Sequence, residues 1–219
     1  GENWREGFSW QRGVERNLDP CDSPEFFKGL GCYGTLLDPN RKVKSLLLSF
    51  LNLNGTLPDT LGLMTDIEEF FMTENTLHGP IPESICNFTK IRTFDAARNK
   101  LNGTIPLCVG DMAMLFKIDL RSNELTGAIP PGFGNIQELQ ELYLSENDLS
   151  GPIPQELYNA RRLEVLFLSY NKLTGVVPRL WSRFKMKETP AMTGLSWLDL
   201  RSNELTGTYP DIVSDFGAV

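Results

Sequence analysis

Leucine and isoleucine recur along this chain in a fixed order that repeats about every 24 residues. The fullest copy reads L-x-x-L-x-L-x-x-N-x-L-x-G-x-I-P and runs from Leu139 to Pro154. Its asparagine slot holds Asn75, Asn99, Asn123, Asn147 and Asn171 at intervals of 24 residues, then Asn203 after 32. Leu51 occupies the same slot one unit earlier. We count seven copies between Val43 and Pro210, and such a period predicts an array of stacked units.

Each position of the phrase has a physical role. The segment around Leu142 and Leu144 alternates apolar and polar residues, which predicts a short β-strand. Stacked units would lay these strands side by side as a parallel sheet and bury their apolar side in a shared core. Asn147 is expected to turn inward, because its amide can satisfy backbone groups that the bend leaves unpaired. Gly151 permits the turn, and Pro154 sets an extended path before the return segment.

This unit length and leucine spacing are those of a leucine-rich repeat, and the L-x-G-x-I-P portion resembles the plant-type subclass. That subclass is found in receptor-kinase ectodomains and polygalacturonase-inhibiting proteins, and the resemblance covers roughly four-fifths of the chain. It implies an α/β fold: a leucine-rich repeat solenoid with a parallel sheet on the concave face and a second, short sheet after the asparagine.

The resemblance extends to the N-terminus, because Asp19-Pro20-Cys21 followed by Cys32 is similar to the family's cysteine-bearing cap. We therefore expect one structural domain, with an N-terminal cap over residues 1–42 and a solenoid of seven repeats over residues 43–219. The chain departs from the family pattern in three places. The cap lacks a tryptophan between its cysteines, Leu51 replaces the first asparagine, and no cysteine pair closes the C-terminus.

Composition and charge narrow the partners. The chain is 41% apolar and 22% charged, as a single extended domain should be, and its formal charge is −7. Nucleic acid is not an expected partner, because phosphate binding needs clustered lysine and arginine. No run reaches the roughly 18 apolar residues of a membrane helix, so we expect no membrane span. The chain opens at Gly1 without a signal sequence, which indicates the mature part of a secreted precursor or an expressed fragment.

Cysteines and glycosylation triplets together predict an oxidising setting, either secreted or on the extracellular face of the plasma membrane. The resemblance implies a Cys21–Cys32 bridge in the cap. Cys86 and Cys108 fall on the return segments of adjacent units, and two alternatives stay open: a bridge across one repeat, or two buried thiols. The Asn-x-Thr acceptor triplets begin at Asn54, Asn87 and Asn102.

The sequence predicts no catalytic, metal or cofactor site. His78 is the only histidine, and the cysteines are isolated, so neither a catalytic triad nor a zinc site can be assembled. Asp95 and Asp119 occupy the same position of neighbouring strands, a spacing compatible with a glycosidase pair. Arg98 and Arg121 stand close by on the same face, however, so ion pairing with these aspartates is the simpler interpretation.

A binding site is expected on the outward positions of the concave sheet, where each repeat offers different side chains. The large or charged residues at these positions are Phe71, Asp95, Arg98, Asp119, Arg121, Tyr143, Phe167, Tyr170, Trp197 and Asp199. Exposed aromatic rings beside arginine are typical of binding hot spots. The alternative is that the rings cover one another as cross-strand pairs.

The expected function is an extracellular recognition module for a protein, peptide or glycan. One alternative is an inhibitor of a secreted polysaccharide hydrolase. Another is an adhesive or ice-binding surface, suggested by hydroxyls at Thr126, Ser150, Thr174 and Thr206. An insertion near residues 187–194 would form either a contact loop or a tolerated surface bulge. Apolar Val213 and Phe216 near the C-terminus predict an open edge, which leaves a missing cap, a dimer that buries the edge, or a tolerated exposed edge as alternatives.

Overall fold

The computed structural model of the chain describes residues 30–33, 42–177 and 195–207. Several predicted features lie outside the described residues. They are Cys21 with its expected bridge to Cys32, most of the cap, the insertion near residues 187–194, and the C-terminal residues Val213 and Phe216.

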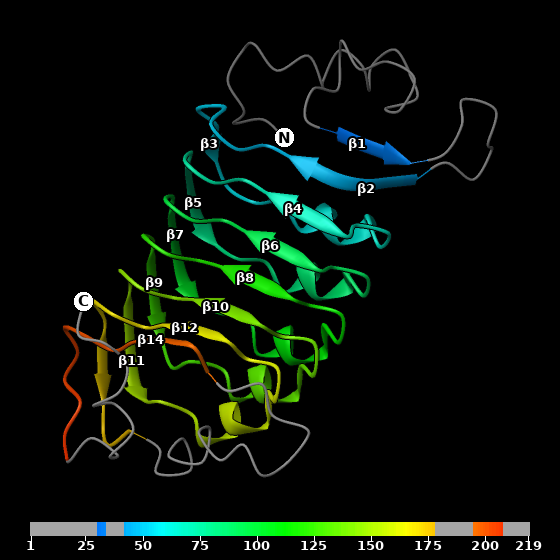
Figure 1. Ribbon diagram of the computed structural model, residues 1–219. Helices are drawn as coiled ribbons and strands as arrows, with labels where there is room; N and C mark the ends of the chain where they lie inside the picture. Colours follow the sequence, from blue (N-terminus) through cyan, green and yellow to red (C-terminus); the bar gives the residue numbers. More distant parts are fainter. Residues whose placement is uncertain (1–29, 34–41, 178–194, 208–219) are drawn as a thin grey trace.

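The predicted parallel sheet is present and has more strands than the other sheet of the described residues (Figure 1). Its order is β1-β2-β4-β6-β8-β10-β12-β14, and every neighbouring pair is parallel except β1 with β2. We call this the long sheet. Its strands are β1 (Leu30–Tyr33), β2 (Lys42–Leu47), β4 (Glu69–Phe71), β6 (Thr93–Asp95), β8 (Lys117–Asp119), β10 (Glu141–Tyr143), β12 (Val165–Phe167) and β14 (Trp197–Asp199).

A second sheet follows the asparagine turns, as the resemblance implies, and lies along another side of the coil (Figure 1). Its order is β13-β11-β9-β7-β5-β3. The strands are β3 (Asn54–Gly55), β5 (Thr76–Pro80), β7 (Lys100–Thr104), β9 (Glu124–Gly127), β11 (Asp148–Pro152) and β13 (Lys172–Thr174). Two parallel sheets therefore share one interior.

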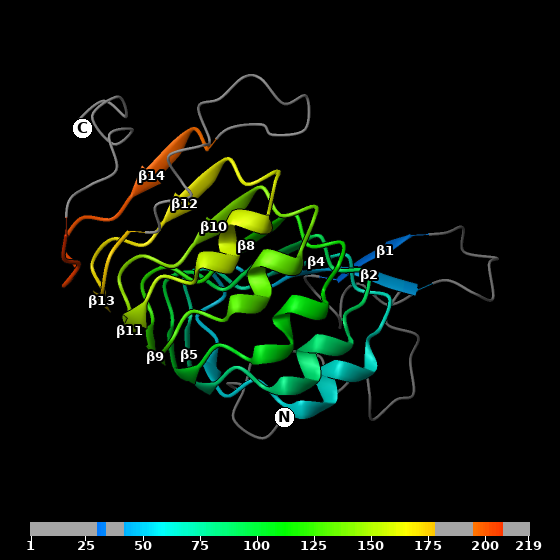
Figure 2. The same cartoon turned by 90° about the horizontal axis from the view of Figure 1, so that it is seen from below.

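The return segments are short 3-10 helices, and the described residues contain no α-helix, which corrects the helical half of the α/β expectation. Figure 2 shows these helices stacked in a column of their own. They are η1 (Asp59–Leu63), η2 (Glu83–Asn87), η3 (Leu107–Asp111), η4 (Pro131–Asn135) and η5 (Gln155–Asn159). Each follows directly after a proline in the N-cap position, and 3-10 turns of this kind are frequent as short connectors.

The leucine slots of the phrase form one continuous core. Leu142, Leu144 and Leu149 are fully buried, and the same slots of the neighbouring units are filled by other aliphatic or phenylalanine side chains. Equivalent core residues lie opposite each other in adjacent strands: Leu142 pairs with Ile118 on one side and with Leu166 on the other. The core is therefore shared between units, because no single unit could bury its apolar edge alone.

The asparagines form a ladder that ties each unit to the one before it. Asn147 Nδ2 donates to the carbonyls of Leu144 and Leu120, at 3.2 and 2.9 Å. Its Oδ1 accepts from the backbone N–H of Leu125 at 3.0 Å. The inward turn predicted for Asn147 is thus confirmed, and the amide satisfies backbone groups that no strand ladder reaches.

Candidate functional site

The outward side chains of the long sheet form a face with several exposed or partly exposed residues, among them Leu47, Tyr143 and Trp197. We call it the long-sheet face. One column of this face is confirmed by strand register and consists of Leu47, Phe71, Asp95, Asp119, Tyr143, Phe167 and Asp199. The columns on either side hold Glu141, Val165 and Trp197, and Arg121, Ser145, Ser169 and Arg201. The sheet thereby assembles residues that are 24 positions apart in the sequence.

Asp119 and Arg121 form a fork at the centre of this face. Arg121 Nε donates to Asp119 Oδ1 at 2.9 Å, and Arg121 Nη2 donates to Oδ2 at 2.7 Å. The backbone N–H of Arg121 also donates to Oδ1, at 3.2 Å. Asp119 is only 1% exposed, so it cannot present its carboxylate to a ligand. It holds Arg121 in place instead, and these hydrogen bonds raise the pKa of the arginine.

Tyr143 lies beside this fork and connects it to the aromatic residues. Its ring meets Phe167 edge to face with 5.3 Å between centroids, and the Arg121 guanidinium carbon lies 4.6 Å from its centroid. Lys117 Nζ is 5.2 Å from the same centroid. The two rings therefore pair across neighbouring strands, and both stay partly exposed.

The hydroxyl of Tyr143 faces a carboxylate. It donates to Glu141 Oε2 at 3.2 Å. Partial burial, followed by the nearby Glu141 charge, raises the pKa of Tyr143 to about 12. The tyrosine is therefore a neutral hydrogen-bond donor over the whole physiological range. Glu141 is a predicted flank of the concave-face site, whereas Lys117 is a residue that the sequence analysis missed, although the 24-residue period places both in the Trp197 column.

The same fork recurs at the end of the sheet because the sequence D-L-R-S-N-E-L-T-G occurs twice. Arg201 Nε and Nη2 donate to Asp199 Oδ1 and Oδ2 at 2.9 and 2.8 Å. These bonds are the main cause of the lowered pKa of Asp199 and of the raised pKa of Arg201. The two forks therefore have matching geometry on β8 and β14.

Asp95 and Arg98 do not form an ion pair with each other, because Arg98 pairs with Glu74 instead, which corrects the ion pairing expected for Arg98. Asp95 accepts from the Thr73 hydroxyl at 2.5 Å. Arg98 Nη1 lies 2.5 Å from Glu74 Oε1, on the preceding unit. Both Arg98 and Glu74 have left-handed backbone angles, which carry their side chains away from the Asp95 column.

This left-handed conformation recurs in every unit, one residue before the asparagine slot. The row consists of Phe50, Glu74, Arg98, Ser122, Glu146, Tyr170 and Ser202, with φ between 53° and 60°. We call it the rim row. Tyr170 belongs to it and is 54% exposed, while Trp197 in the sheet is 61% exposed. Phe50, which the sequence places on the flank of the expected site, is 69% exposed.

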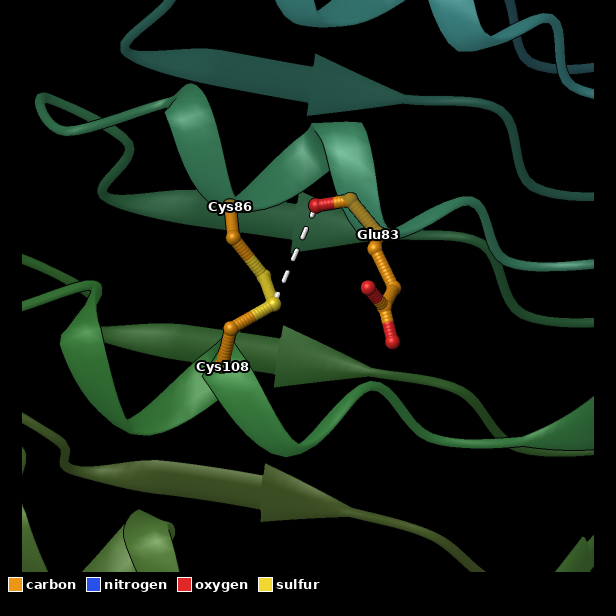
Figure 3. Close-up of a disulfide and its surroundings, with 3 residues drawn as sticks. All are labelled: Glu83, Cys86 and Cys108. Atoms are coloured by element: carbon orange, nitrogen blue, oxygen red, sulfur yellow. Dashed lines mark hydrogen bonds between the residues drawn. A yellow bond between two sulfur atoms is a disulfide. The ribbon is translucent and has the colours of Figure 1, made fainter.

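The predicted alternatives for Cys86 and Cys108 are resolved in favour of a bridge (Figure 3). It joins η2 to η3 with 5.9 Å between the Cα atoms. The three glycosylation triplets also lie away from the long sheet: Asn54 and Asn102 are on the second sheet and Asn87 ends η2, all exposed. A sugar on any of them would leave the long-sheet face accessible.

Two further observations concern the classes of site that the sequence excluded. Among residues 30–33, 42–177 and 195–207, no group of three His, Cys, Asp or Glu side chains could hold a metal ion. Within the same ranges, no helix has the length and apolar character needed to cross a membrane. Of the proposed hydroxyl row on the second sheet, Thr126 and Thr206 donate to the carbonyls of Gly103 and Gly175, at 3.2 and 3.3 Å.

Comparison with known proteins agrees with this architecture. The Leucine Rich Repeat family profile matches residues 114–136, 138–160, 162–184 and 194–216. No curated protein sequence matches the chain. The plant peptide hormone receptor RGFR1, solved in complex with RGF2, is 31% identical over 75% of this chain and 25% of its own, with a TM-score of 0.68.

Two other solved structures are similar. The ectodomain of the receptor kinase GASSHO1/SCHENGEN3 from Arabidopsis thaliana, in complex with CASPARIAN STRIP INTEGRITY FACTOR 2, is 27% identical over 97% of this chain and 30% of its own, with a TM-score of 0.69. A plant ice-binding protein is 24% identical over 84% of this chain and 71% of its own, with a TM-score of 0.62. The last likeness shows the fold alone.

The stacked coils, the asparagine ladder and the family profile define a leucine-rich-repeat protein. Within that class, the chain belongs to the plant type and is similar to receptor-kinase ectodomains. It spans 25% and 30% of the length of the two receptor chains compared.

Proposed function

We propose that this chain is an extracellular recognition module that binds a peptide or protein on the long-sheet face, with a glycan as the less favoured ligand. The observation that carries the proposal is the partly exposed Tyr143–Phe167 pair beside the fixed Arg121 guanidinium. Aromatic rings and arginine are the residues that dominate binding energy at interfaces. Tyr170 and Trp197 extend the same exposed apolar area on neighbouring strands.

Rigidity supports a binding role over incidental exposure. Arg121 is held by two side-chain bonds to a buried aspartate, and the Tyr143 ring is held by Phe167 and Glu141. Side chains that are already ordered lose little conformational entropy when a ligand binds. The proposed ligand class follows from the relatives, one of which is named as a peptide hormone receptor.

The proposed extracellular location rests on the Cys86–Cys108 bridge and on the exposed positions of Asn54, Asn87 and Asn102. We further propose that the chain contains seven repeats over residues 43–219 behind a cysteine-bearing cap over residues 1–42. The module is proposed to be non-catalytic. Of its two candidate carboxylates, Asp119 is buried in the fork and Asp95 is engaged by Thr73.

The test uses two probes, a displayed library of random dodecapeptides and an array of cell-wall oligosaccharides. Replacing Tyr143 and Phe167 together by alanine should weaken the binding of any selected probe at least tenfold, because the hot-spot rings are lost. The matched control replaces Leu63 and Leu107, exposed apolar residues on η1 and η3, and should leave binding unchanged. Equal binding by both double variants would refute the proposed site. Inhibition of a polygalacturonase would instead favour the hydrolase-inhibitor function.

A further inference from the structure

The rim row contains two glutamates, Glu74 and Glu146, and the residues that face them on the next unit differ. Glu74 faces Arg98, whose Nη1 lies 2.5 Å from Glu74 Oε1. The equivalent neighbour of Glu146 is Tyr170. The backbone has the same form in both places, because φ is 53° and 55° for the first two residues and 58° and 55° for the second two. One rim glutamate therefore has an arginine partner, and the other has a tyrosine beside it.

An open surface pocket lies where Glu146 and Tyr170 meet. The residues that line it are Asn123, Glu146, Asn147, Asp148 and Tyr170. The amides of Asn123 and Asn147 are bonded to backbone carbonyls of the ladder, so they give the pocket a fixed wall. Tyr170 is 54% exposed, so a ligand in the pocket can contact its ring.

Glu146 is the carboxylate of this pocket whose charge has no counterion among the described residues. Asp148 pairs with Lys172, with 2.6 Å between Asp148 Oδ1 and Lys172 Nζ. Glu146 Oε2 accepts only from the Ser122 hydroxyl, at 2.6 Å. A hydroxyl donor leaves the negative charge in place, and in the part of the chain that the structure describes Oε1 has no hydrogen-bond partner.

The chemistry of the pocket suits a guanidinium group. Arg98 shows within the same molecule which side chain fits beside a rim glutamate. A carboxylate accepts charge-assisted hydrogen bonds from guanidinium N–H groups, and an aromatic ring attracts a cation that lies over its face. Arg201, on the unit after Tyr170, is paired with Asp199 and does not line the pocket, so it does not supply this cation. The formal charge of −7 also favours a basic partner.

We propose that the pocket beside Glu146 and Tyr170 binds an arginine side chain of the peptide ligand. The guanidinium would donate to the Glu146 carboxylate and lie against the Tyr170 ring. The pocket belongs to the same two units as the aromatic pair, because Glu146 follows Tyr143 by three residues and Tyr170 follows Phe167 by three. One peptide can therefore contact both. This inference rests on the proposed function and narrows its ligand class to peptides that contain arginine.

The experiment selects displayed random dodecapeptides against the full chain and measures the affinity of synthetic copies by fluorescence polarisation. Selected sequences should share an arginine. Replacing that arginine by citrulline, which keeps the shape but lacks the charge, should weaken binding about tenfold, because the ion pair and the ring contact are both lost. Lysine in its place should cause a smaller loss, since it keeps the charge without the planar set of donors.

Variants of the chain test the pocket itself. Glu146→Gln removes the charge at nearly constant shape and should weaken the binding of arginine peptides about threefold. Tyr170→Arg recreates the Glu74–Arg98 pair, so the new guanidinium should occupy the pocket, and arginine and citrulline peptides should then bind equally. Glu156→Gln is the matched control, because Glu156 is an exposed glutamate on η5 that does not line the pocket, and it should leave affinity unchanged.

The outcomes separate this inference from the proposed function. Selected peptides without a common arginine, or equal binding of arginine and citrulline copies to the unaltered chain, would overturn the inference. So would a Glu146→Gln variant that binds arginine peptides as tightly as the Glu156→Gln control. If binding is nevertheless lost when Tyr143 and Phe167 become alanine, the proposed function stands. Failure to select any peptide would overturn both.

Discussion

The asparagine ladder allows a quantitative prediction of stability. Some backbone carbonyls in it accept from two asparagines and others from one, so the cost of removing an asparagine differs between units. Asn147 serves the carbonyls of Leu120 and Leu144, but each of these also accepts from another asparagine, Asn123 and Asn171 respectively. Replacing Asn147 by alanine therefore leaves one buried backbone group, the Leu125 N–H, without the partner that it now has.

The contacts of Asn75 are not duplicated in this way, because the preceding unit has Leu51 where the others have asparagine. Its Nδ2 donates to the Leu48 carbonyl at 2.8 Å, and its Oδ1 accepts from the N–H of Leu53 at 2.8 Å. Among the described residues, the Leu48 carbonyl has no second side-chain donor of the kind that Leu120 has. Replacing Asn75 by alanine thus strands two buried backbone groups where Asn147→Ala strands one, and it also removes the partner of the more exposed Leu51 N–H, which donates to Asn75 Oδ1 at 3.2 Å.

An unsatisfied buried polar group costs about 1–3 kcal/mol, and an ordinary hydrogen bond contributes about 1 kcal/mol. We therefore expect Asn147→Ala to lower the free energy of unfolding by about 2–4 kcal/mol. Asn75→Ala should cost about 1–3 kcal/mol more. Leu48 and Leu53 are both 2% exposed, so water cannot readily replace the missing amide.

Urea denaturation followed by circular dichroism measures these differences on single variants. Asn159→Ala is the matched control, since Asn159 is exposed at the end of η5 and its loss should change stability by no more than about 0.5 kcal/mol. The reasoning fails if Asn75→Ala is no more destabilising than Asn147→Ala. It also fails if both are as mild as the control.

Three further predictions follow from local contacts. Removing the Cys86–Cys108 bridge with a double serine variant should lower the free energy of unfolding by about 3 kcal/mol, from the 22-residue separation it spans, as urea denaturation would measure. The raised pKa of Tyr143, about 12, favours the protonated folded state, so its contribution to stability is present below pH 10 and is lost as pH rises through 12. The Tyr143→Phe variant should lack this loss of stability between pH 10 and pH 12 in alkaline denaturation curves. Gly134→Ala should cost at least about 3 kcal/mol, because its Cβ would meet the Glu156 carbonyl oxygen at 2.0 Å. Gly151→Ala, with only its φ of +77° to strain it, should cost about 1–2 kcal/mol, and urea denaturation measures both glycine variants.

The scaffold was predictable from sequence because each of its positions repeats. Leu142 and Asn147 have equivalents every 24 residues, and one interpretation had to fit all of them at once. The register of the Tyr143 and Phe167 column followed for the same reason. The 3-10 form of the return segments did not follow, because the residues between the prolines and the next strand share no periodic signal strong enough to separate helix types.

Side-chain partners were less predictable because they depend on backbone angles that a repeat phrase does not specify. Arg98 is three residues from Asp95, and proximity in sequence favoured that pair. The left-handed angle at Arg98 places it in the rim row instead, opposite Glu74, which has the same angle. In the same way, the choice between a bridge and free thiols depended on how η2 and η3 align: Cys86 is the fourth residue of one and Cys108 the second of the other.

The two nonapeptides show why a site residue in such an array cannot be judged from its own unit. Asp119 and Asp199 are followed by the same eight residues and form the same fork, yet the Asp119 side chain is 1% exposed and that of Asp199 is 16% exposed. The difference arises on the next strand. Tyr143 lies beside Asp119 in register and packs against Arg121, whereas β14 is the last strand of the described sheet. The environment of each outward residue therefore depends on the residue about 24 positions later, which lies beside it on the next strand. The affinity of a ligand that spans several strands should then depend on the order of the units as well as on their individual side chains.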